Sequence, residues 1–348
     1  MEAFLHRTMR LDKAEMSIHR QILCHRYIGV EPNSWQMKMS GFVHSVIYQM
    51  PPQTFTFRFG QLRTKPPGAA GARGAKELPS RSRRATGELI ASFPAMLQAC
   101  LNGGLQKTAH SAVPVSPDEL ARDAAAVRAA GANELHIHAR TAEGAETLDP
   151  AAVADALLAI RAAVPGMPVG LGTGAWIPPS GRLRHEHIRS WSTKPDYASV
   201  NLNEPDALEV IDILFSQGVG VEAGLWDQKD ARRFVEYVDF KKCLRVLIEM
   251  IHESPASAVA YARRILEMLR HCKCALPILL HGQGNTVWVC VELARSEGLD
   301  TRVGLEDGLT LPTGEIAPNN ASLVSAALHI LDPIRSAAET KSRSAASP

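Results

Sequence analysis

The chain has 348 residues, of which 45% are hydrophobic and 21% are charged, a composition typical of globular proteins with a sizeable core. Its 38 basic and 36 acidic residues nearly cancel, so charge gives no reason to expect nucleic acid or a membrane surface as a partner. No apolar run approaches the roughly 18 residues of a membrane-spanning helix, and the N-terminus lacks the apolar core of a signal peptide. The six scattered cysteines favour reduced thiols, and we expect a cytoplasmic protein.

The first part of the chain differs in composition from the rest. Between Arg63 and Arg84 there are seven basic residues, one acid (Glu77) and several prolines and glycines. Such a segment cannot bury enough apolar surface to offset the chain entropy lost on folding. We therefore expect residues 1–95 to be an extension outside the folded domain, either disordered or the result of a start codon assigned too early, with Met96 as the true start. Residues 336–348 are expected to be a disordered tail.

From Met96 onward, short runs rich in Val, Ile and Leu alternate with longer segments of helical period, the pattern of repeated β-α units in a parallel sheet. Strands are expected at Leu97–Leu101, Glu134–His138, Pro168–Leu171, Tyr197–Leu202, Val219–Ala223, Leu244–Glu249, Pro277–His281 and Arg302–Leu305. Helices are expected at Pro117–Ala130, Pro150–Val164, Gly181–Ser190, Asp206–Gln217, Asp227–Tyr237, Ala256–Cys272, Asn285–Gly298 and Asn319–Leu331.

Eight such units in about 240 residues match the size of a (β/α)₈ TIM barrel, which we predict for residues 96–335. A doubly wound open sheet uses the same units and is the alternative fold. It usually has fewer strands, and its first strand leads into a G-x-G-x-x-G turn, which Asn102-Gly103-Gly104 does not complete. The barrel is therefore the preferred interpretation.

Polar residues fall at the carboxyl ends of the expected strands, where barrel enzymes carry their chemistry. They are Asn102, His136, His138, Arg140, Thr173, Ser199, Asn201, Glu222, Glu249, His281, Glu306 and Asp307. Polar residues scattered at random would not recur at the carboxyl end of one strand after another. The phasing favours an enzyme over a barrel that only binds a ligand.

The pair His136 and His138 predicts a metal site. Side chains two residues apart on a strand point to the same face, so both imidazoles can face the barrel mouth. Two histidines and a carboxylate leave a position open on zinc for substrate or water. Hydrogen-bonded core histidines are the alternative interpretation. Glu306 is the best third ligand because strands eight and two both flank strand one, and Glu222 and His281 compete with it.

Two arginines at the same end of the barrel suit an anionic ligand. Arg140 and Arg302 could each form a forked contact with a carboxylate, or each could form a structural ion pair with Asp307 or another acid. The turn from His281 to Gly284 opens a helix, and its free N–H groups would favour a phosphate. A glycine turn alone also explains that segment.

Several of these segments together resemble the beta-keto acid cleavage enzyme family, which includes 3-keto-5-aminohexanoate cleavage enzymes. The matching segments are Asn102–Gly104, Pro114–Pro117, Ala130–Ala132, His136–Arg140, Thr173–Gly174, Ala198–Asn201, Arg302–Asp307 (RVGLED) and Asn319–Val324. The resemblance covers residues 97–331. It implies a zinc-dependent TIM barrel that condenses a beta-keto acid with acetyl-CoA, giving acetoacetate and a new acyl-CoA. It also implies a homo-oligomer, a tetramer.

The resemblance also implies roles for individual residues. His136, His138 and Glu306 would bind zinc, and Arg302, Asp307 and Ser199 would take part in catalysis, with Arg302 and Asp307 orienting and deprotonating the substrate. Six of the other polar residues at the mouth are expected to contact the substrate. They are Asn102, Arg140, Thr173, Asn201, Glu222 and His281.

The chain departs from the family pattern at two places. Members often carry a glutamate just after the strand-one glycines, where this chain has Leu105 and Gln106, so a 3-keto-5-amino acid is in doubt as the substrate. Members often have a serine where this chain has Gly172, so Thr173 is expected to take over its contact. With its shorter loops, the chain is expected to belong to a compact subgroup with a different side-chain pocket.

Two other functions remain open from the sequence. A metal-dependent hydrolase barrel also uses a His-x-His pair, but it usually places the pair on strand one and adds histidines on strands five and six. Here those strands end in Glu222 and Glu249. A barrel that binds metal or CoA ligands without catalysis is the non-enzyme alternative.

A chain truncated to begin at Met96 should fold and keep its activity, because the domain is predicted to start there. Expression of the truncated chain, followed by circular dichroism and an activity assay beside the full-length protein, checks this. Loss of folding or activity would show that the extension is part of the working enzyme.

Overall fold

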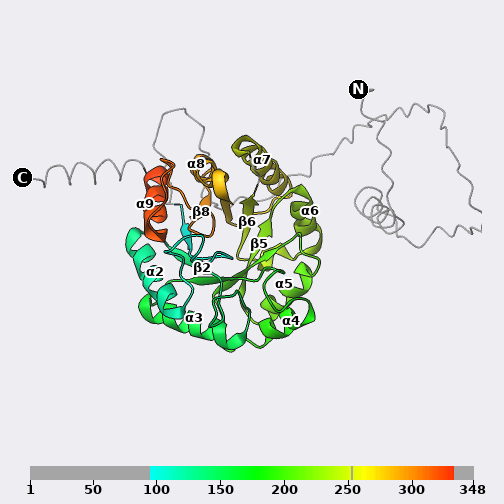
Figure 1. The fold of residues 1–348 in the computed structure, drawn as a ribbon. Helices are drawn as coiled ribbons and strands as arrows, with labels where there is room; N and C mark the ends of the chain where they lie inside the picture. Colours follow the sequence, from blue (N-terminus) through cyan, green and yellow to red (C-terminus); the bar gives the residue numbers. More distant parts are fainter. Residues whose placement is uncertain (1–94, 252–253, 333–348) are drawn as a thin grey trace, which may run out of the picture. The chain divides into compact units, whose positions relative to one another are not determined.

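A computed structural model of the protein describes residues 95–251 and 254–332 (Figure 1). The predicted extension at residues 1–95, except for residue 95 itself, and the predicted tail at 336–348 lie outside the described residues. Within the described part no helix is long and apolar enough to cross a membrane.

Parallel strands close into a barrel in which each strand pairs with the next and β8 pairs with β1. The strands are β1 (Leu97–Cys100), β2 (Glu134–Ile137), β3 (Val169–Gly172), β4 (Tyr197–Asn201), β5 (Gly220–Leu225), β6 (Arg245–Met250), β7 (Ile278–Gly282) and β8 (Asp300–Val303). The predicted (β/α)₈ barrel is confirmed, with every strand within two residues of its expected position.

Helices surround the barrel and form its outer ring (Figure 1). They are α2 (Pro117–Ala130), α3 (Pro150–Ala163), α4 (Arg182–Arg189), α5 (Ala207–Ser216), α6 (Gln228–Tyr237), α7 (Pro255–His271), α8 (Val287–Glu297) and α9 (Asn320–Leu331), with short 3₁₀ turns η2 (Phe240–Lys242) and η3 (Gly284–Thr286). Their ends follow local rules. The Ser116 side chain and Glu119 form a reciprocal capping box at the start of α2, and Gly131 ends that helix with a φ of 110°.

Strand β8 begins and ends two residues earlier than expected, and Gly304 explains the earlier end. A Cβ on Gly304 would lie 1.8 Å from the carbonyl oxygen of Cys100, so the two backbones meet there too closely for any side chain. The chain then turns, and the N–H groups of Asp307 and Gly308 both donate to the carbonyl of Gly304, at 3.0 Å each. Glu306 and Asp307 therefore lie in a tight turn over the barrel mouth.

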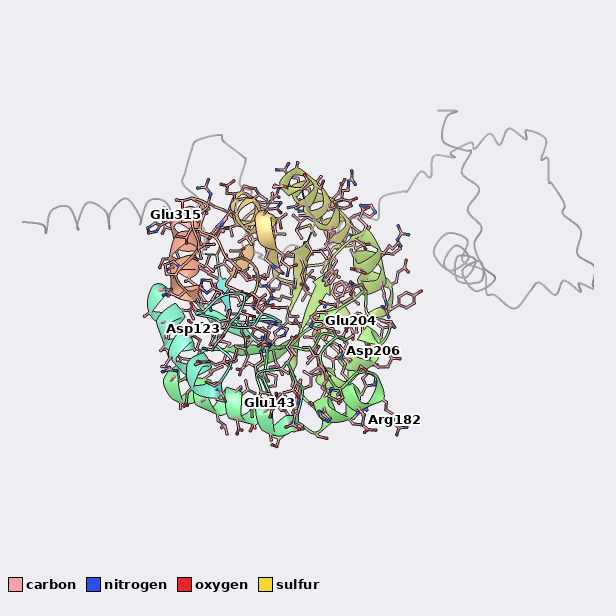
Figure 2. The ribbon with its side chains drawn as sticks, viewed as in Figure 1. Asp123, Glu143, Arg182, Glu204, Asp206 and Glu315 are labelled. Carbon is pink, nitrogen blue, oxygen red and sulfur yellow. The ribbon has the colours of Figure 1, made fainter. Side chains whose placement is uncertain are left out.

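The loop that follows β3 is anchored by buried charges. The Arg184 guanidinium bonds Glu204 at 2.6 Å and Asp206 at 2.8 Å, and it also donates to the carbonyl of Thr173. The backbone N–H of Ala175 donates to Glu204 at 2.8 Å. Figure 2 shows Glu204 and Asp206 near each other beside α5. This network fixes the loop from β3 to α4 at the rim of the mouth.

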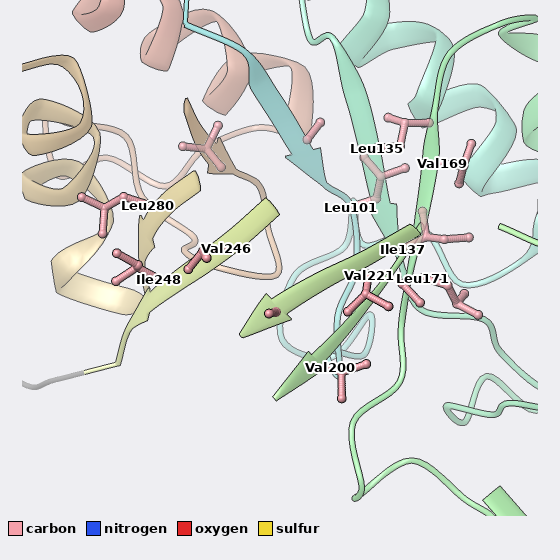
Figure 3. Packing of buried hydrophobic residues seen from close by; sticks show 14 of the residues in the cluster. Leu101, Leu135, Ile137, Val169, Leu171, Val200, Val221, Val246, Ile248 and Leu280 are labelled. Carbon is pink, nitrogen blue, oxygen red and sulfur yellow. The ribbon is translucent and has the colours of Figure 1, made fainter. Parts of the chain in front are cut away.

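The main core lies between the strands and the helices. Leu135 and Ile137 of β2 and Val169 and Leu171 of β3 point outward, are fully buried and pack with neighbouring aliphatic side chains (Figure 3). Because side chains alternate along a strand, burying Leu135 and Ile137 outside turns His136 toward the barrel interior. The core thus places the predicted metal ligand.

Polar side chains fill the barrel interior below the mouth, and we call them the floor: Gln98, Glu134, Tyr197, Glu222 and Arg245. Arg245 bonds Glu134 and, through Nε, Glu222 at 2.5 Å. Gln98 Nε2 donates to Glu134, Tyr197 and Glu222 at 2.9–3.2 Å. Removing one partner would leave a buried charge uncompensated, which is strongly destabilising.

Asn320 connects the elements that close the barrel. Its Nδ2 donates to the carbonyl of Leu101 at 2.9 Å and to Asp123 Oδ2 at 2.6 Å, and its Oδ1 accepts from the backbone N–H of Leu305 at 2.7 Å. The residue is fully buried. One amide therefore joins the end of β1, helices α2 and α9, and the turn that carries Glu306.

Replacing Asn320 by alanine should lower the free energy of unfolding by about 2–4 kcal/mol, because a backbone N–H and a carbonyl lose their buried partners. Urea denaturation measures this. Ser325→Ala, on the exposed face of the same helix, is the matched control and should change stability by less than about 0.5 kcal/mol. Equal stabilities of the two variants would contradict this account.

Candidate active site

Three side chains that the sequence predicts as metal ligands meet at the barrel mouth. Glu306 Oε1 lies 3.6 Å from His136 Nε2 and 3.8 Å from His138 Nε2, and one ligand atom from each residue falls within 4.8 Å of the others. Both histidines are buried, with the ring centroids 5.3 Å apart. Among the described residues this is the trio of His, Cys, Asp or Glu side chains arranged to hold a metal ion.

The chemistry of this donor set fits a divalent cation. Burial lowers the pKa of His136 to about 4, so its imidazole is neutral and can donate a lone pair. Burial acts to raise the pKa of Glu306, but the Arg302 guanidinium that bonds it opposes this effect, so the pKa is lowered and the carboxyl is ionised. Glu306 Oε2 is also buried without a hydrogen-bond partner. Two imidazoles and a carboxylate are a common set of ligands for catalytic zinc.

Glycines make room for this trio. A Cβ on Gly172 would lie 2.2 Å from His138 Nε2, and one on Gly103, whose φ is 48°, would lie 2.4 Å from Glu306 Cγ. The glycine at 172, where relatives were expected to carry a serine, thus accommodates the imidazole. Asn102 braces the same histidine, because its side chain accepts from the N–H of His138 and donates to its carbonyl, both at 2.9 Å.

A row of charged side chains continues from Glu306 along the mouth. Arg302 bonds Glu306 Oε1 at 2.9 Å and Asp307 Oδ1 at 2.8 Å. His281 Nδ1 lies 3.3 Å from Asp307 Oδ1, and Glu249 Oε2 lies 3.6 Å from His281 Nε2. The structure thus brings together Arg302, Asp307 and His281 as one network with the trio. The sequence places Glu249 at the end of strand six but assigns it no role, and the structure brings it beside His281.

The ionisation of this row follows from its neighbours. Burial acts to raise the pKa of Asp307, but Arg302 and His281 outweigh it and hold that pKa far below its ordinary range. Burial and the Arg302 guanidinium act to lower the pKa of His281. The carboxylates of Asp307 and Glu249 outweigh them and raise this pKa to about 9. Asp307 is therefore an anion beside two cations at neutral pH.

Arg140 makes different contacts from those expected of a substrate ligand. Its guanidinium donates to the carbonyls of Gly103, Leu105 and Gly144, the second at 2.8 Å and the third at 3.2 Å. It is buried and holds together the loops that follow β1 and β2. These carbonyls already occupy the terminal nitrogens of Arg140, which counts against the forked contact with a substrate carboxylate. That contact remains a prediction.

Of the remaining predicted residues, Ser199 and Asn201 lie on β4, Glu222 lies on β5, and Thr173 directly follows β3. Thr173 Oγ1 donates to the carbonyl of Ser199 at 2.6 Å, and Asn201 Nδ2 lies 3.4 Å from Glu204 Oε1. Ser199 itself is half-buried. Glu222 is fully buried in the floor, below the trio. Substrate contacts by these residues stay predictions, and the bonds of Glu222 to Arg245 and Gln98 favour a structural role.

Sequence reasoning missed Glu146, which bonds a predicted ligand. Glu146 Oε1 lies 2.5 Å from His138 Nδ1. The residue returns to β2 through a turn, in which Arg140 and Glu146 form an antiparallel bridge. Such a return leaves no periodic signal in the sequence, so only the folded chain reveals the contact.

The fold and the site together define a TIM barrel with a candidate metal centre at the carboxyl ends of its strands. A sequence model of the beta-keto acid cleavage enzyme family matches residues 94–343. The chain belongs to the beta-keto acid cleavage enzyme family. Members of this family cleave carbon–carbon bonds of beta-keto acids, so the resemblance predicted from the motifs is confirmed.

Individual relatives are distant. The chain is 24% identical over 234 residues to a 3-keto-5-aminohexanoate cleavage enzyme of Fusobacterium nucleatum, in a match that covers 63% of this chain and 84% of that enzyme. A complex of ObcA with oxaloacetate matches at 19% identity with a TM-score of 0.51, over 61% of this chain and 62% of that one. A ternary complex of ObcA with a C4-CoA adduct and oxalate matches at 18% identity and a TM-score of 0.51, over 66% and 64%. The chain thus spans less than two thirds of the ObcA structures, and this likeness shows the fold.

The raised pKa of His281 predicts a pH dependence of stability. Folded His281 holds its proton up to about pH 9, whereas an unfolded histidine releases it near 6.5, so its contribution is present below pH 6.5 and is lost as the pH rises through 9. Urea unfolding of metal-free protein between pH 6 and 9.5 should show this fall, and His281→Gln should flatten it. An unchanged slope in the variant would contradict the assigned ionisation.

Proposed function

We propose that the protein is a zinc-dependent beta-keto acid cleavage enzyme with acetyl-CoA as co-substrate. In the overall reaction, R–CO–CH₂–COO⁻ and acetyl-CoA give acetoacetate and R–CO–CoA, so the carboxymethyl unit moves to the acetyl group. Family membership supports the reaction class. The observation that carries the proposal is the trio of His136, His138 and Glu306 in direct contact with the Arg302–Asp307 pair.

His136, His138 and Glu306 would hold the metal ion. When bound, a divalent metal would polarise the keto carbonyl and make the neighbouring methylene more acidic. The protein contributes the neutral imidazole of His136, the ring of His138, an ionised carboxylate and glycines that leave space around them. The Arg302 guanidinium bonds Glu306 at 2.9 Å and would stabilise negative charge that develops on the substrate.

Asp307 is the candidate base. Its Oδ1 is held by Arg302 and faces His281, whereas its Oδ2 is buried without a hydrogen-bond partner and is the oxygen that would accept a substrate proton. The depressed pKa keeps the carboxylate ionised but makes it a weak base. The substrate must therefore become acidic before transfer occurs, which agrees with a carbonyl polarised beside it.

The substrate carboxylate has several possible donors at the mouth. Ser199 presents a half-buried hydroxyl, and His281 carries a buried Nε2 without a hydrogen-bond partner. ObcA was solved with oxaloacetate, itself a beta-keto acid, and with a C4-CoA adduct. Those two ligand classes are the ones we propose here. The side chain of the keto acid, a homo-oligomeric state and a cytoplasmic location remain predictions.

A metal-dependent hydrolase gains no particular support. The residues at the ends of β5 and β6 that would have to be histidines are Glu222, bound in the floor, and Glu249, beside His281. A barrel that binds metal without catalysis would contain the same trio, and only an activity assay separates it from an enzyme.

Purified protein should contain about one zinc ion per chain and should form acetoacetate from acetyl-CoA with at least one member of a panel of beta-keto acids. His136→Ala should lose the metal and at least about 100-fold of the rate, the scale of losing a main electrostatic stabiliser. Elemental analysis and single-substrate kinetics measure both. His329→Ala, on the exposed face of α9, is the matched control and should keep metal and activity. A His136→Ala enzyme that retains both would overturn the proposal.

A further inference from the structure

His138 is held between two carboxylates. Its Nδ1 lies 2.5 Å from Glu146 Oε1, and its Nε2 faces Glu306 Oε1 at 3.8 Å on the opposite side of the ring. An ionised carboxylate only accepts hydrogen bonds, so the contact with Glu146 requires the proton on Nδ1. The lone pair of a neutral ring then lies on Nε2, which is the atom that faces the trio.

Other parts of the chain leave space for the Glu146 carboxylate and surround it. A Cβ on Gly104 would lie 3.1 Å from Glu146 Oε2, so the bare backbone after β1 leaves room for the carboxylate. The indole of Trp176 lies close enough to the Glu146 side chain to help lower the pKa of its carboxyl. Side-chain exposure of Glu146 is 15%, low for a carboxylate in a turn between elements. The position of Glu146 is thus set from β1, from β2 and from the loop after β3.

Trp176 lies beside the trio at the rim. Gly172 and Gly174 stand two residues apart at the end of β3, and a Cβ on the first would meet the His138 ring, whereas a Cβ on the second would meet the Trp176 ring at 2.4 Å. The imidazole and the indole therefore cover neighbouring positions of the same segment. Trp176 is 56% exposed, so much of the indole remains open to solvent.

We propose that Glu146 is a positioning residue that fixes the tautomer and orientation of His138 for a divalent metal, and that Trp176 holds Glu146 in place. Carboxylates that accept from a ligating histidine fix its ring and raise its basicity. The loop from β3 to α4 is thereby linked to the metal centre through Trp176, Glu146 and His138. This inference rests on the proposed metal site and concerns residues that would not touch the ion.

Metal affinity is the direct test. Glu146→Ala should bind Zn²⁺ and Co²⁺ about 10–100-fold more weakly than the unaltered protein, the usual loss for such a partner, in competition with a chelator of known affinity. Glu143→Ala is the matched control, because Glu143 is an exposed carboxylate in the same turn (labelled in Figure 2). Thermal melting of the metal-free variants shows whether the fold is retained.

Two further variants keep the test decisive should the alanine variant unfold. Glu146→Gln keeps an acceptor oxygen but loses the charge, so it should give a smaller loss of affinity and an altered visible spectrum of bound Co²⁺. Trp176→Phe removes only the indole donor and should weaken metal binding less than Glu146→Ala does. It should also remove most of the change in tryptophan fluorescence that accompanies metal binding.

The outcomes separate this inference from the proposed function. If the unaltered protein binds metal and Glu146→Ala binds it equally well, the positioning role is wrong, whereas the metal site stands. If the unaltered protein binds no divalent metal, the metal site itself is wrong and the inference falls with it. Weaker binding in Glu146→Ala with unchanged binding in Glu143→Ala supports the inference.

Discussion

Glu306 Oε1 is the atom on which the arrangement of the mouth depends. It accepts a hydrogen bond from Arg302 and faces the Nε2 atoms of His136 and His138. Arg302 in turn bonds Asp307, so one guanidinium aligns the candidate ligand and the candidate base. This contact needs the turn that begins at Gly304, where the backbone of β8 passes too close to β1 for a side chain. Barrel closure and site geometry are therefore parts of the same constraint, because the strand pair that closes the barrel also delivers the carboxylate.

The interior is organised in two polar layers that depend on the small residues of β3. Gly170 leaves room for the ring of Tyr197 in the floor, and Gly172 leaves room for the ring of His138 in the mouth. Large side chains from neighbouring strands thus cross a strand that has almost no inward-facing side chains of its own. Many barrels fill this space with branched apolar residues. Here the floor is a buried ion-pair cluster around Arg245, which seals the space beneath the candidate metal centre.

The alternation of apolar runs with helical segments allowed most of the fold to be predicted. Strands buried on their outer face and helices with capping residues both leave strong local patterns in the sequence. The end of β8 was misplaced because Gly304 stops the strand through a contact with Cys100, a residue far away in the chain. The same limit applies to the site. Period-two alternation predicted that His136 and His138 would face inward together. Nothing local indicated that Arg140 would be bound by backbone carbonyls, or that Glu146 would reach His138 from a turn.

The sequence by itself determined the barrel, the inward direction of the histidine pair and the family, because strand alternation and an ordered set of short motifs are properties of local chain order. The tertiary structure alone decided which carboxylates meet that pair. Glu306 approaches from the last strand and Glu146 from a returning turn, and their distances to the imidazoles depend on barrel closure and loop packing, which no local pattern encodes. The paired histidines therefore follow from spacing, whereas the partners that orient and charge them follow from contacts between distant segments.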